Sequence, residues 1–444
     1  MGFLFLAPRV ITSRVIAVVC VWMCVVWGAA AAETQGDTEP FPRTLTLGQA
    51  LSMLDDGDPA LRLGESRLAT NRADRARLDD RNALSASLRL DLRAADRIAT
   101  DGHDFTNESR AILTLDKPLI RFGTDRALYE SLETGAKAIS VRQERNRSEV
   151  RHEALRAFFG VILADYAYAA QDEVMTLAFL TFKNKRDRME LYNEVAAVEV
   201  HRLEAVYLDE FAERTRLRLE RRASRLRLAV ALNRTDAYPD RVVEPDLSGY
   251  GRETPDYEEV LARVLESSAA MRIARLETEA ARRRLEGLSA GAGPVLGTRF
   301  EAAEYRYRVP STRDQFRASV YLDIPLGGAM KRRGEIRAAA ARVLELEARE
   351  AALEHDLRVE VLRLVQRLAY LDTELRAAEA ELLFSELDLD RVRLLYEMEV
   401  RARIGTANSA VAAAISRLAH ARYERALVWD RLDILMNNEP VQFP

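Results

Sequence analysis

The sequence of 444 residues contains an internal duplication, and this feature constrains the fold more than any other. The segment Leu115-Asp116-Lys117-Pro118-Leu119 recurs as Leu322-Asp323-Ile324-Pro325-Leu326, an offset of 207 positions. Further along, Leu191-Tyr192 corresponds to Leu395-Tyr396 and Leu232-Asn233 to Met436-Asn437, both at an offset of 204. Because the order is kept and the offset drifts little, the chain consists of two copies of one structural unit with a period of about 205 residues.

Proline and glycine residues concentrate between the two copies, at Pro239, Pro245, Gly249, Gly251 and Pro255. Such a cluster of breakers is typical of a linker. We therefore predict a first structural repeat over residues 33–233, a linker over 234–255, a second repeat over 256–438 and a tail over 439–444.

The first 32 residues have the pattern of an export signal. Arg9 and Arg14 precede an apolar run from Val15 to Trp27, and the small residues of Ala29–Ala32 follow it. This run is shorter than the roughly 20 residues of a membrane-spanning helix. We predict a signal peptide over residues 1–32, with an uncleaved N-terminal anchor as the alternative. Because Cys20 and Cys24 both lie in this segment, the mature chain is expected to have neither a disulfide nor a thiolate metal site.

The composition excludes several classes of protein. Charged residues make up 31% of the chain, with 66 basic against 70 acidic residues, and the mean hydropathy is −0.21. These values argue against a disordered chain, a collagen and a polytopic helical membrane protein. The absence of a positive excess argues against a nucleic-acid partner. The small number of glycines and prolines, 20 and 13, favours long helices.

Each repeat is predicted to contain an opening helical stretch, two strands and a long helical hairpin. The opening helices are expected over residues 45–84 and 257–288, and the long helices over 124–191 and 329–395. In the second long helix, apolar residues from Leu353 to Leu382 recur at alternating spacings of three and four, which is typical of a coiled-coil seam. The pattern stops near Tyr192 and Tyr396 and then resumes, so each helix is expected to turn back there.

The strand pairs are predicted over residues 85–117 and 294–325. Apolar residues such as Leu88 and Leu90 alternate with charged residues such as Arg89, which is the period of a strand with two different faces. A polar loop is expected over 100–107. Because proline cannot donate to a sheet, Pro118 and Pro325 are expected to end the strands and to mark the strand-to-helix junctions.

Strands of this length and alternation fit a membrane β-barrel, although a small soluble sheet packed on helices is the alternative. The charged face needs water, whereas the leucine face needs hydrocarbon. Four strands are too few to close a barrel, and lipid excludes open sheet edges, so several copies are expected to pool their strands. The residues expected to face lipid are Leu88, Leu90, Leu92, Leu113, Leu115, Phe316, Val320 and Leu322. Those expected to face the lumen are Arg89, Asp91, Arg93, Arg317 and Asp323.

These features resemble the TolC-like family of outer-membrane efflux proteins. The resemblance covers the mature chain and rests on Leu45-Thr46-Leu47-Gly48-Gln49-Ala50-Leu51, the duplicated strand–Pro–Leu–helix junctions and the hairpin ends. It implies a mainly α fold with β strands, in which long antiparallel helical hairpins form an α-barrel and four strands contribute to a shared transmembrane β-barrel. It also implies a homotrimer in the cell outer membrane, with a helical tunnel in the periplasm. Family members export drugs, toxins or proteins by joining an inner-membrane transporter through a periplasmic adaptor.

The hairpin tips depart from the family pattern, which usually has glycine three residues after the tip aromatic residue. Here Val195 and Glu399 occupy those positions, and Gly405 is the nearby glycine. The segment Asn408–Ala414 also lacks the carboxylates that some members place there. By resemblance, the adaptor-docking tips are expected to comprise Leu191, Tyr192, Val195, Leu395, Tyr396, Glu399 and Gly405.

No pattern in the sequence indicates catalysis. The five histidines are scattered without metal-ligand spacing, and no nucleotide-binding or nucleophile motif occurs in a strand-to-helix context. We therefore predict no enzyme, no cofactor and no metal. A periplasmic or surface coiled-coil protein without a channel remains the alternative function. A dedicated secretion conduit would have the same fold as a drug-efflux outlet.

Overall fold

The computed structural model describes residues 44–54, 58–99, 102–107, 109–122, 124–234, 238–290, 293–305, 315–324, 329–398, 404–438 and 441. Contacts divide the chain into residues 1–41 and 42–444, and every described residue belongs to the second unit. The expected signal peptide, Pro325 and Glu399 lie outside the described residues.

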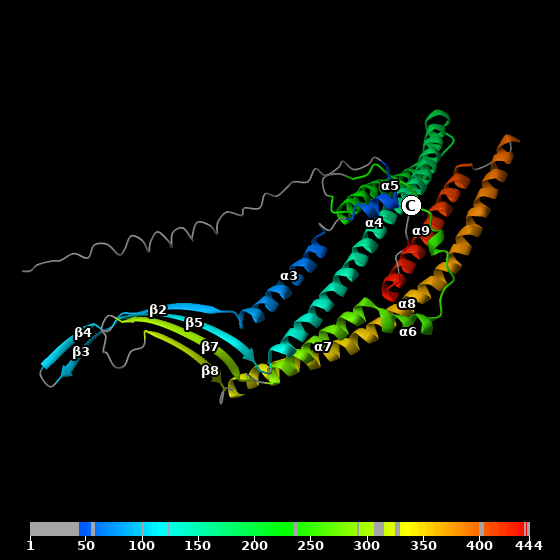
Figure 1. Ribbon diagram of the computed structural model, residues 1–444. Coiled ribbons are helices and arrows are strands. Elements are labelled where there is room, and N and C mark those ends of the chain that lie inside the picture. The colour runs from blue at the N-terminus through cyan, green and yellow to red at the C-terminus, as the bar shows by residue number, and fades with distance from the viewer. Residues whose placement is uncertain are drawn as a thin grey trace, which may run out of the picture. The chain divides into compact units, whose positions relative to one another are not determined.

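Two long helical hairpins dominate this unit (Figure 1). The first consists of α4 (Thr124–Tyr192) and α5 (Ala197–Ala231), and the second of α8 (Ala329–Glu397) and α9 (Ile404–Met436). The two long helices, α4 and α8, have 69 residues each, which corresponds to about 100 Å at 1.5 Å per residue. The predicted long helices are confirmed within a few residues, and each packs against the helix that follows it.

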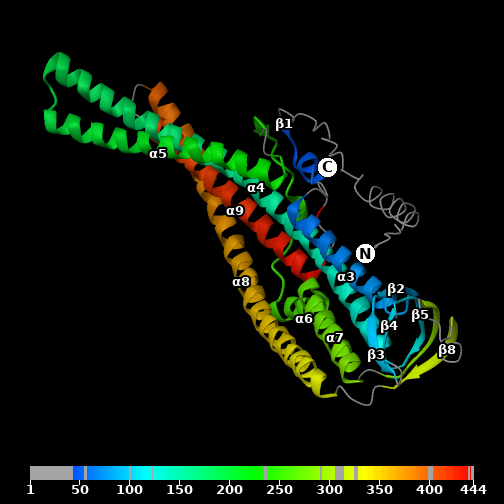
Figure 2. The ribbon, with the colours of Figure 1, turned by 90° about the vertical axis from the view of Figure 1, so that its left-hand side faces the viewer.

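The two repeats pack together along α4 and α9. Besides α5, α4 contacts α7 (Ala269–Ser289) and α9 of the second repeat (Figure 2). Phe158 and Phe159 of α4 and Leu432 of α9 are buried there, and the rings of Phe159 and Tyr423 lie 4.7 Å apart. In α8, the predicted seam is confirmed, because Leu357, Val361, Leu364, Leu368, Leu371 and Ala378 are all buried.

Asparagines in the left-handed conformation end three of the hairpin helices. Asn193, Asn233 and Asn437 have φ values of 51°, 55° and 55° and follow α4, α5 and α9. In each case the backbone N–H of the next residue donates a hydrogen bond to a carbonyl near the helix end, as the N–H of Asn438 does to the carbonyl of Asp433 at 2.9 Å. Asparagine tolerates this conformation better than most residues do. This conformation accounts for the repeated Leu232-Asn233 and Met436-Asn437 pairs.

The opening helices are interrupted, contrary to the expectation of continuous helices. The first stretch divides into α2 (Leu47–Ser52) and α3 (Pro59–Asp80), with Asp58 as the N-cap of α3. The second divides into α6 (Tyr257–Ser267) and α7, and Ser268 caps α7 by accepting the N–H of Met271. The capping residues favour a new helix start over continuation of the helix before them. The Thr46–Gln49 pair forms a capping box on α2.

Four of the strands form an antiparallel sheet in the order β2-β5-β7-β8. Its members are β2 (Ser85–Asp91), β5 (Arg110–Arg121), β7 (Val295–Tyr305) and β8 (Phe316–Asp323). The predicted strand pairs are present, and pairing of β5 with β7 joins the two repeats. Most of the expected 100–107 loop instead forms β4 (Gly102–Asn107), which pairs with β3 (Ala94–Ala99).

Pro118 does not end its strand, which corrects the expected position of the junction. β5 continues to Arg121, and its register with β7 shifts between Pro118 and Ile120. The last pair of β5 with β2 is Asp116 with Ser85, so Pro118 has a paired strand on one side only. A proline is tolerated where a strand has a free side or a bulge, because no ladder hydrogen bond is lost there.

The linker contains the short β6 (Arg241–Val242), which pairs in parallel with β1 (Thr44–Leu45), and the 3₁₀ turn η1 (Ser248–Tyr250). Within the described ranges, no helix is both long and apolar enough to cross a bilayer.

Candidate functional site

The register of the sheet gives it one apolar face that crosses all four strands. Leu88 of β2 is paired with Leu113 of β5, which is opposite Ala302 of β7, which in turn is opposite Phe316 of β8. Leu88 is 65% exposed and Phe316 71%. Four of the other residues expected to face lipid lie on this same face by register, namely Leu90, Leu115, Val320 and Leu322. Leu92 lies just beyond the end of β2.

The opposite face of the sheet is polar and internally paired. Asp116 of β5 accepts hydrogen bonds from Arg299 Nε of β7 at 2.8 Å and from the Tyr321 hydroxyl of β8 at 3.0 Å. The Tyr321 ring lies across Gly297, where an added Cβ would come within 2.5 Å of the ring. Water and ion pairs can satisfy this face, whereas hydrocarbon cannot.

The residues expected to face the lumen lie on or next to this polar face. Asp91 pairs with Arg110 at 2.7 Å, and Arg317 lies 3.8 Å from Glu301. Arg89 and Asp323 share the face by register, and Arg93 follows the end of β2. Asp116, Arg299 and Tyr321 lie at the centre of this face. That the face lines a lumen stays a prediction.

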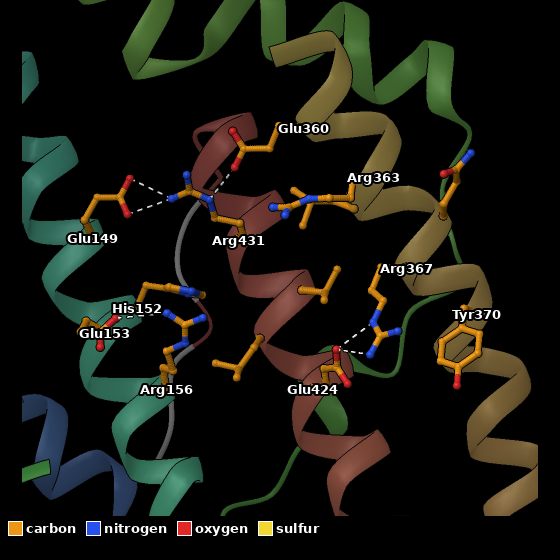
Figure 3. Close-up of a pocket in the computed structure, with 14 residues that line it drawn as sticks. Glu149, His152, Glu153, Arg156, Glu360, Arg363, Arg367, Tyr370, Glu424 and Arg431 are labelled. Atoms are coloured by element: carbon orange, nitrogen blue, oxygen red, sulfur yellow. Dashed lines mark hydrogen bonds and ion pairs between the residues drawn. The ribbon is translucent and has the colours of Figure 1, made fainter. Parts of the chain in front are cut away.

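A concave groove lies between α4, α8 and α9, with a volume of about 800 Å³ (Figure 3). Arg431 of α9 bridges Glu149 of α4 at 2.8 Å and Glu360 of α8 at 3.0 Å. Arg367 of α8 binds Glu424 of α9 at 2.7 Å. These ion pairs hold the three helices at the wall of the groove.

The hairpin tips expose their aromatic residues. Tyr192 is 67% exposed and Tyr396 62%, so neither is buried against the neighbouring helix. Leu191 is also exposed, whereas Val195 and Leu395 are half-buried. Gly405 lies in the first turn of α9, where an added Cβ would come 2.8 Å from a methyl of Leu177 in α4. Close packing of α9 on α4 therefore explains the glycine at this position.

Comparison with known proteins identifies the fold. Neither a protein-family model nor a curated protein matches the sequence. Solved structures do match, among them the CmeC outer membrane channel of Campylobacter jejuni, with 11% identity, a TM-score of 0.70 and coverage of 89% of this chain and 86% of CmeC. The outer membrane protein VceC of Vibrio cholerae has 13% identity and a TM-score of 0.67, with 88% and 96% coverage of the two chains. The MtrE outer membrane channel of Neisseria gonorrhoeae, in its open state, has 16% identity, a TM-score of 0.58 and 89% coverage of both chains.

This chain has the same fold as these outer membrane proteins. The predicted fold class, with long antiparallel helical hairpins and four strands in a sheet, is confirmed.

A buried polar cluster fixes the linker to both repeats. Asp430 of α9 is 2% exposed and lies 2.7 Å from His152 Nδ1 and 3.0 Å from Arg151 Nη1, both on α4. It also accepts the Tyr250 hydroxyl of the linker at 3.1 Å. Burial, reinforced by the negative charge of Asp430, raises the pKa of Tyr250 above its usual value. The cluster thus joins the first repeat, the linker and the second repeat at one point.

A second set of contacts continues this attachment along α9. Arg252 of the linker binds Asp433 at 2.5 Å, and its guanidinium lies 4.2 Å from the centre of the Trp429 ring. Arg425 binds Asp372 of α8 at 2.7 Å and donates to the carbonyl of Tyr250 at 2.8 Å. Sequence reasoning missed this cluster. The available signal was that Asp430 and Asp433 lie in the largely apolar last turns of the final helix.

The described residues show no arrangement typical of a metal centre. No three His, Cys, Asp or Glu side chains there lie close enough together to hold a metal ion. The side chains of His201 and His420 are exposed and lie near Glu204 and Glu424.

Proposed function

We propose that this protein is the outer-membrane channel of a tripartite efflux or secretion system. It conducts substrates from an inner-membrane transporter and its periplasmic adaptor to the outside. The observation that carries this function is the two-faced sheet, in which exposed leucines and phenylalanine cover one side and Asp116, Arg299 and Tyr321 the other. A wall between lipid and a water-filled lumen needs these two faces.

The apolar face is too large to be explained by a soluble sheet. Leu88 and Leu90 of β2 and Phe316, Val320 and Leu322 of β8 are each more than half exposed. Between these outer strands, Leu113 of β5 and Phe300 of β7 are exposed on the same face. In water, a continuous apolar patch of this kind favours aggregation or docking. In hydrocarbon, the same side chains gain the free energy of transfer, about 25 cal/mol per Å². A periplasmic coiled-coil protein has no use for such a face, so this alternative is not favoured.

The sheet also needs further copies of the chain. Its described edges, β2 and β8, have one paired neighbour each, and lipid does not tolerate unpaired edges. Three copies would supply twelve strands, in agreement with the homotrimer that the resemblance implies. The protomers would join β8 of one copy to β2 of the next and would have their apolar faces toward the outer-membrane lipid.

The helical part of the protomer carries a matching contact surface for another copy. On α5, apolar residues at intervals of seven are exposed, namely Val198, Ala205, Ala212, Leu219 and Leu226. On α8, a set of large apolar side chains apart from the buried seam is exposed, namely Val359, Leu362, Leu383, Phe384, Leu387 and Leu394. A heptad stripe without a partner in its own chain is the pattern of a coiled-coil interface. We propose that α5 of one protomer packs against α8 of the next and so closes the periplasmic tunnel.

The exposed tips of the two hairpins are the proposed contact with the periplasmic adaptor. Tyr192 and Tyr396 are aromatic side chains of the kind that often dominate binding energy at interfaces. The inner-membrane transporter would be reached through the adaptor.

Reconstitution tests this function directly. The detergent-extracted protein is expected to have a trimeric mass, to fractionate with outer membranes and to conduct ions in a planar bilayer. A folded monomer that stays soluble without detergent and gives no conductance would support the coiled-coil alternative. Export of substrate in cells that carry the adaptor and transporter genes adjacent to this one would identify the cargo class, drug or protein.

A further inference from the structure

The groove of Figure 3 is one of three concavities along a single face of α4. The α4 residues that line them recur at helical spacing over twelve turns, for example Ser131, Gly135, Ala138, Arg142, Glu149, His152, Arg156, Ala167, Ala170 and Val174. At 3.6 residues per turn, such positions form one continuous stripe. The concavities are therefore parts of the same wall.

This wall lies opposite the linker. On α9, the linker contacts Trp429 and Asp433, whereas Arg431 faces the groove. Arg431 is two residues from each of them, which is about 200° around a helix with 3.6 residues per turn. When a layer of helices closes into a tube, its concave side faces the inside of the tube. A segment packed on the opposite side, as the linker is here, then lies on the outside. If the protein forms the proposed channel, the three concavities therefore line its tunnel.

The charges on this wall are unevenly neutralised. Nine arginines, seven carboxylates and two histidines line the three concavities. Each of the seven carboxylates has an arginine nitrogen within 3.7 Å or less. In contrast, Arg67 of α3, Arg284 of α7 and Arg363 of α8 have no carboxylate partner among the residues that the structure describes, and all three are exposed. Figure 3 shows that Arg363 extends from α8 toward the groove.

We infer that the tunnel wall favours anions, and that the cargo of this channel carries negative charge as carboxylate, phosphate or sulfate groups. This inference rests on the proposed function. The unpaired guanidinium groups set the local potential, because the paired charges largely cancel at short distance. They belong to three helices, and in a trimer they would repeat three times around the tunnel. Arginine suits this task because it stays charged at any physiological pH and can bind oxyanions through two parallel hydrogen bonds. The chain as a whole has a net charge of −4, so the positive wall does not follow from its composition.

The test measures the reversal potential of the reconstituted trimer in a planar bilayer of uncharged lipid across a KCl gradient. The dilute side is held at about 0.01 M, where the Debye length is about 30 Å and wall charges act across the lumen. The wild-type channel is expected to prefer Cl⁻ over K⁺. The triple variant Arg67→Gln, Arg284→Gln and Arg363→Gln is expected to lose this preference or to reverse it.

A matched control variant removes the same charge from the same three helices. Arg62, Arg272 and Arg358 of α3, α7 and α8 line none of the three concavities, so their replacement by Gln is expected to leave the reversal potential unchanged. A conducting wild-type channel that prefers K⁺, or equal shifts in the two triple variants, would overturn the inference and leave the channel function intact. A trimer that never conducts would overturn the proposed function and this inference with it.

A second measurement does not require an open channel. Both cysteines, Cys20 and Cys24, lie in the expected signal peptide, so Gln366→Cys introduces a single thiol beside Arg363 in the groove. An anionic thiol reagent is expected to react faster there than a cationic one of the same size. Adding Arg363→Gln is expected to lower this ratio, and an unchanged ratio would contradict a positive wall.

Discussion

Tyr250 and Asp430 connect the linker with the last helix of the chain, across a hydrogen bond of 3.1 Å in the buried interior. The two residues are 180 positions apart, and Arg151 and His152 of α4 bind the same carboxylate. The Asp430 side chain, which belongs to the second repeat, thus contacts both the first repeat and the linker. This arrangement makes Asp430 the residue on which the joining of the two repeats depends.

We predict that Asp430→Ala strongly destabilises the protein. Removal of one partner from a buried ion pair costs about 3–5 kcal/mol, because the largely buried guanidinium of Arg151 is left without its carboxylate. His152 Nδ1 loses its hydrogen-bond partner as well. The free energy of unfolding can be followed by tryptophan fluorescence, since Trp429 is the single tryptophan outside the expected signal peptide. Glu153→Ala is the control, because its ion pair with Arg156 is exposed and is worth about 0–1 kcal/mol. Equal losses in both variants would contradict the cluster.

The same cluster predicts a loss of stability at alkaline pH. In the folded protein, the pKa of Tyr250 is raised above its usual value of 10.0, chiefly by burial. A raised pKa means that the unfolded chain loses this proton first, so the contribution of Tyr250 is complete below pH 10 and is lost as the pH rises above it. Trp429 fluorescence against pH measures the loss. The Tyr250→Phe variant has no hydroxyl to ionise at this position, so its stability is expected to fall less steeply with rising pH. Tyr166, with a pKa raised to about 12, still contributes to the loss of stability in this variant. Identical profiles would disprove this role of Tyr250.

The two faces of β2 predict opposite effects for neighbouring residues. Leu90→Arg is expected to hinder membrane insertion by about 2–4 kcal/mol, the cost of an arginine at the bilayer midplane. Arg89→Leu is expected to leave insertion intact and to change conduction. Cysteine at position 89 should react with a water-soluble reagent and cysteine at position 90 should be protected. The reverse pattern would show that the assigned faces are exchanged.

Gly297 predicts a packing effect within the sheet. An added Cβ would come 2.5 Å from the Tyr321 ring, so Gly297→Ala is expected to cost about 1–3 kcal/mol, as overpacked substitutions do. Gly334→Ala in α8 is the matched control, since nothing lies within 4 Å of its added Cβ. That change is expected to stabilise the helix by about 0.5–1 kcal/mol. The temperature at which the extracted protein loses its β structure compares the two variants.

Sequence reasoning succeeded where a local pattern determines the structure. The long helices α4 and α8 could be predicted because no proline interrupts them and because their apolar residues, such as Leu357 and Leu368, follow a heptad spacing. The two faces of the strands could be predicted because successive side chains of a strand point to opposite faces of the sheet. The repeated asparagines Asn233 and Asn437 were visible as well, although their left-handed conformation was not.

The rest depended on contacts between distant residues. Asp116 meets Arg299 across 183 positions, and no local pattern selects that partner. Asp430 resembled the many solvated charges of a long helix, because only the fold places Arg151, His152 and Tyr250 around it. The break at Ser268 followed from a single capping residue in a stretch that otherwise had helical character.

The exposed tip tyrosines predict where the proposed channel would bind a periplasmic adaptor. Tyr396 lies at the end of α8 with most of its side chain exposed, and Tyr192 holds the corresponding position in the first repeat. We expect Tyr396→Ala together with Glu399→Arg to abolish export, because an aromatic anchor is lost and a charge is reversed at the proposed interface. Trimer mass and membrane insertion should be unchanged, since both residues lie far along the chain from the strands.

Tyr238→Ala in the linker is the matched control for this prediction. Tyr238 is also substantially exposed but is remote in sequence from both tips, so its replacement is expected to leave export intact. A photocrosslinker at position 399 is expected to capture the periplasmic adaptor in cells that export, and to lose it when Tyr396 is replaced. Normal export by the double variant, with no crosslink from position 399, would show that the adaptor binds elsewhere. The absence of glycine from positions 195 and 399 would then mark a different mode of coupling to the transporter.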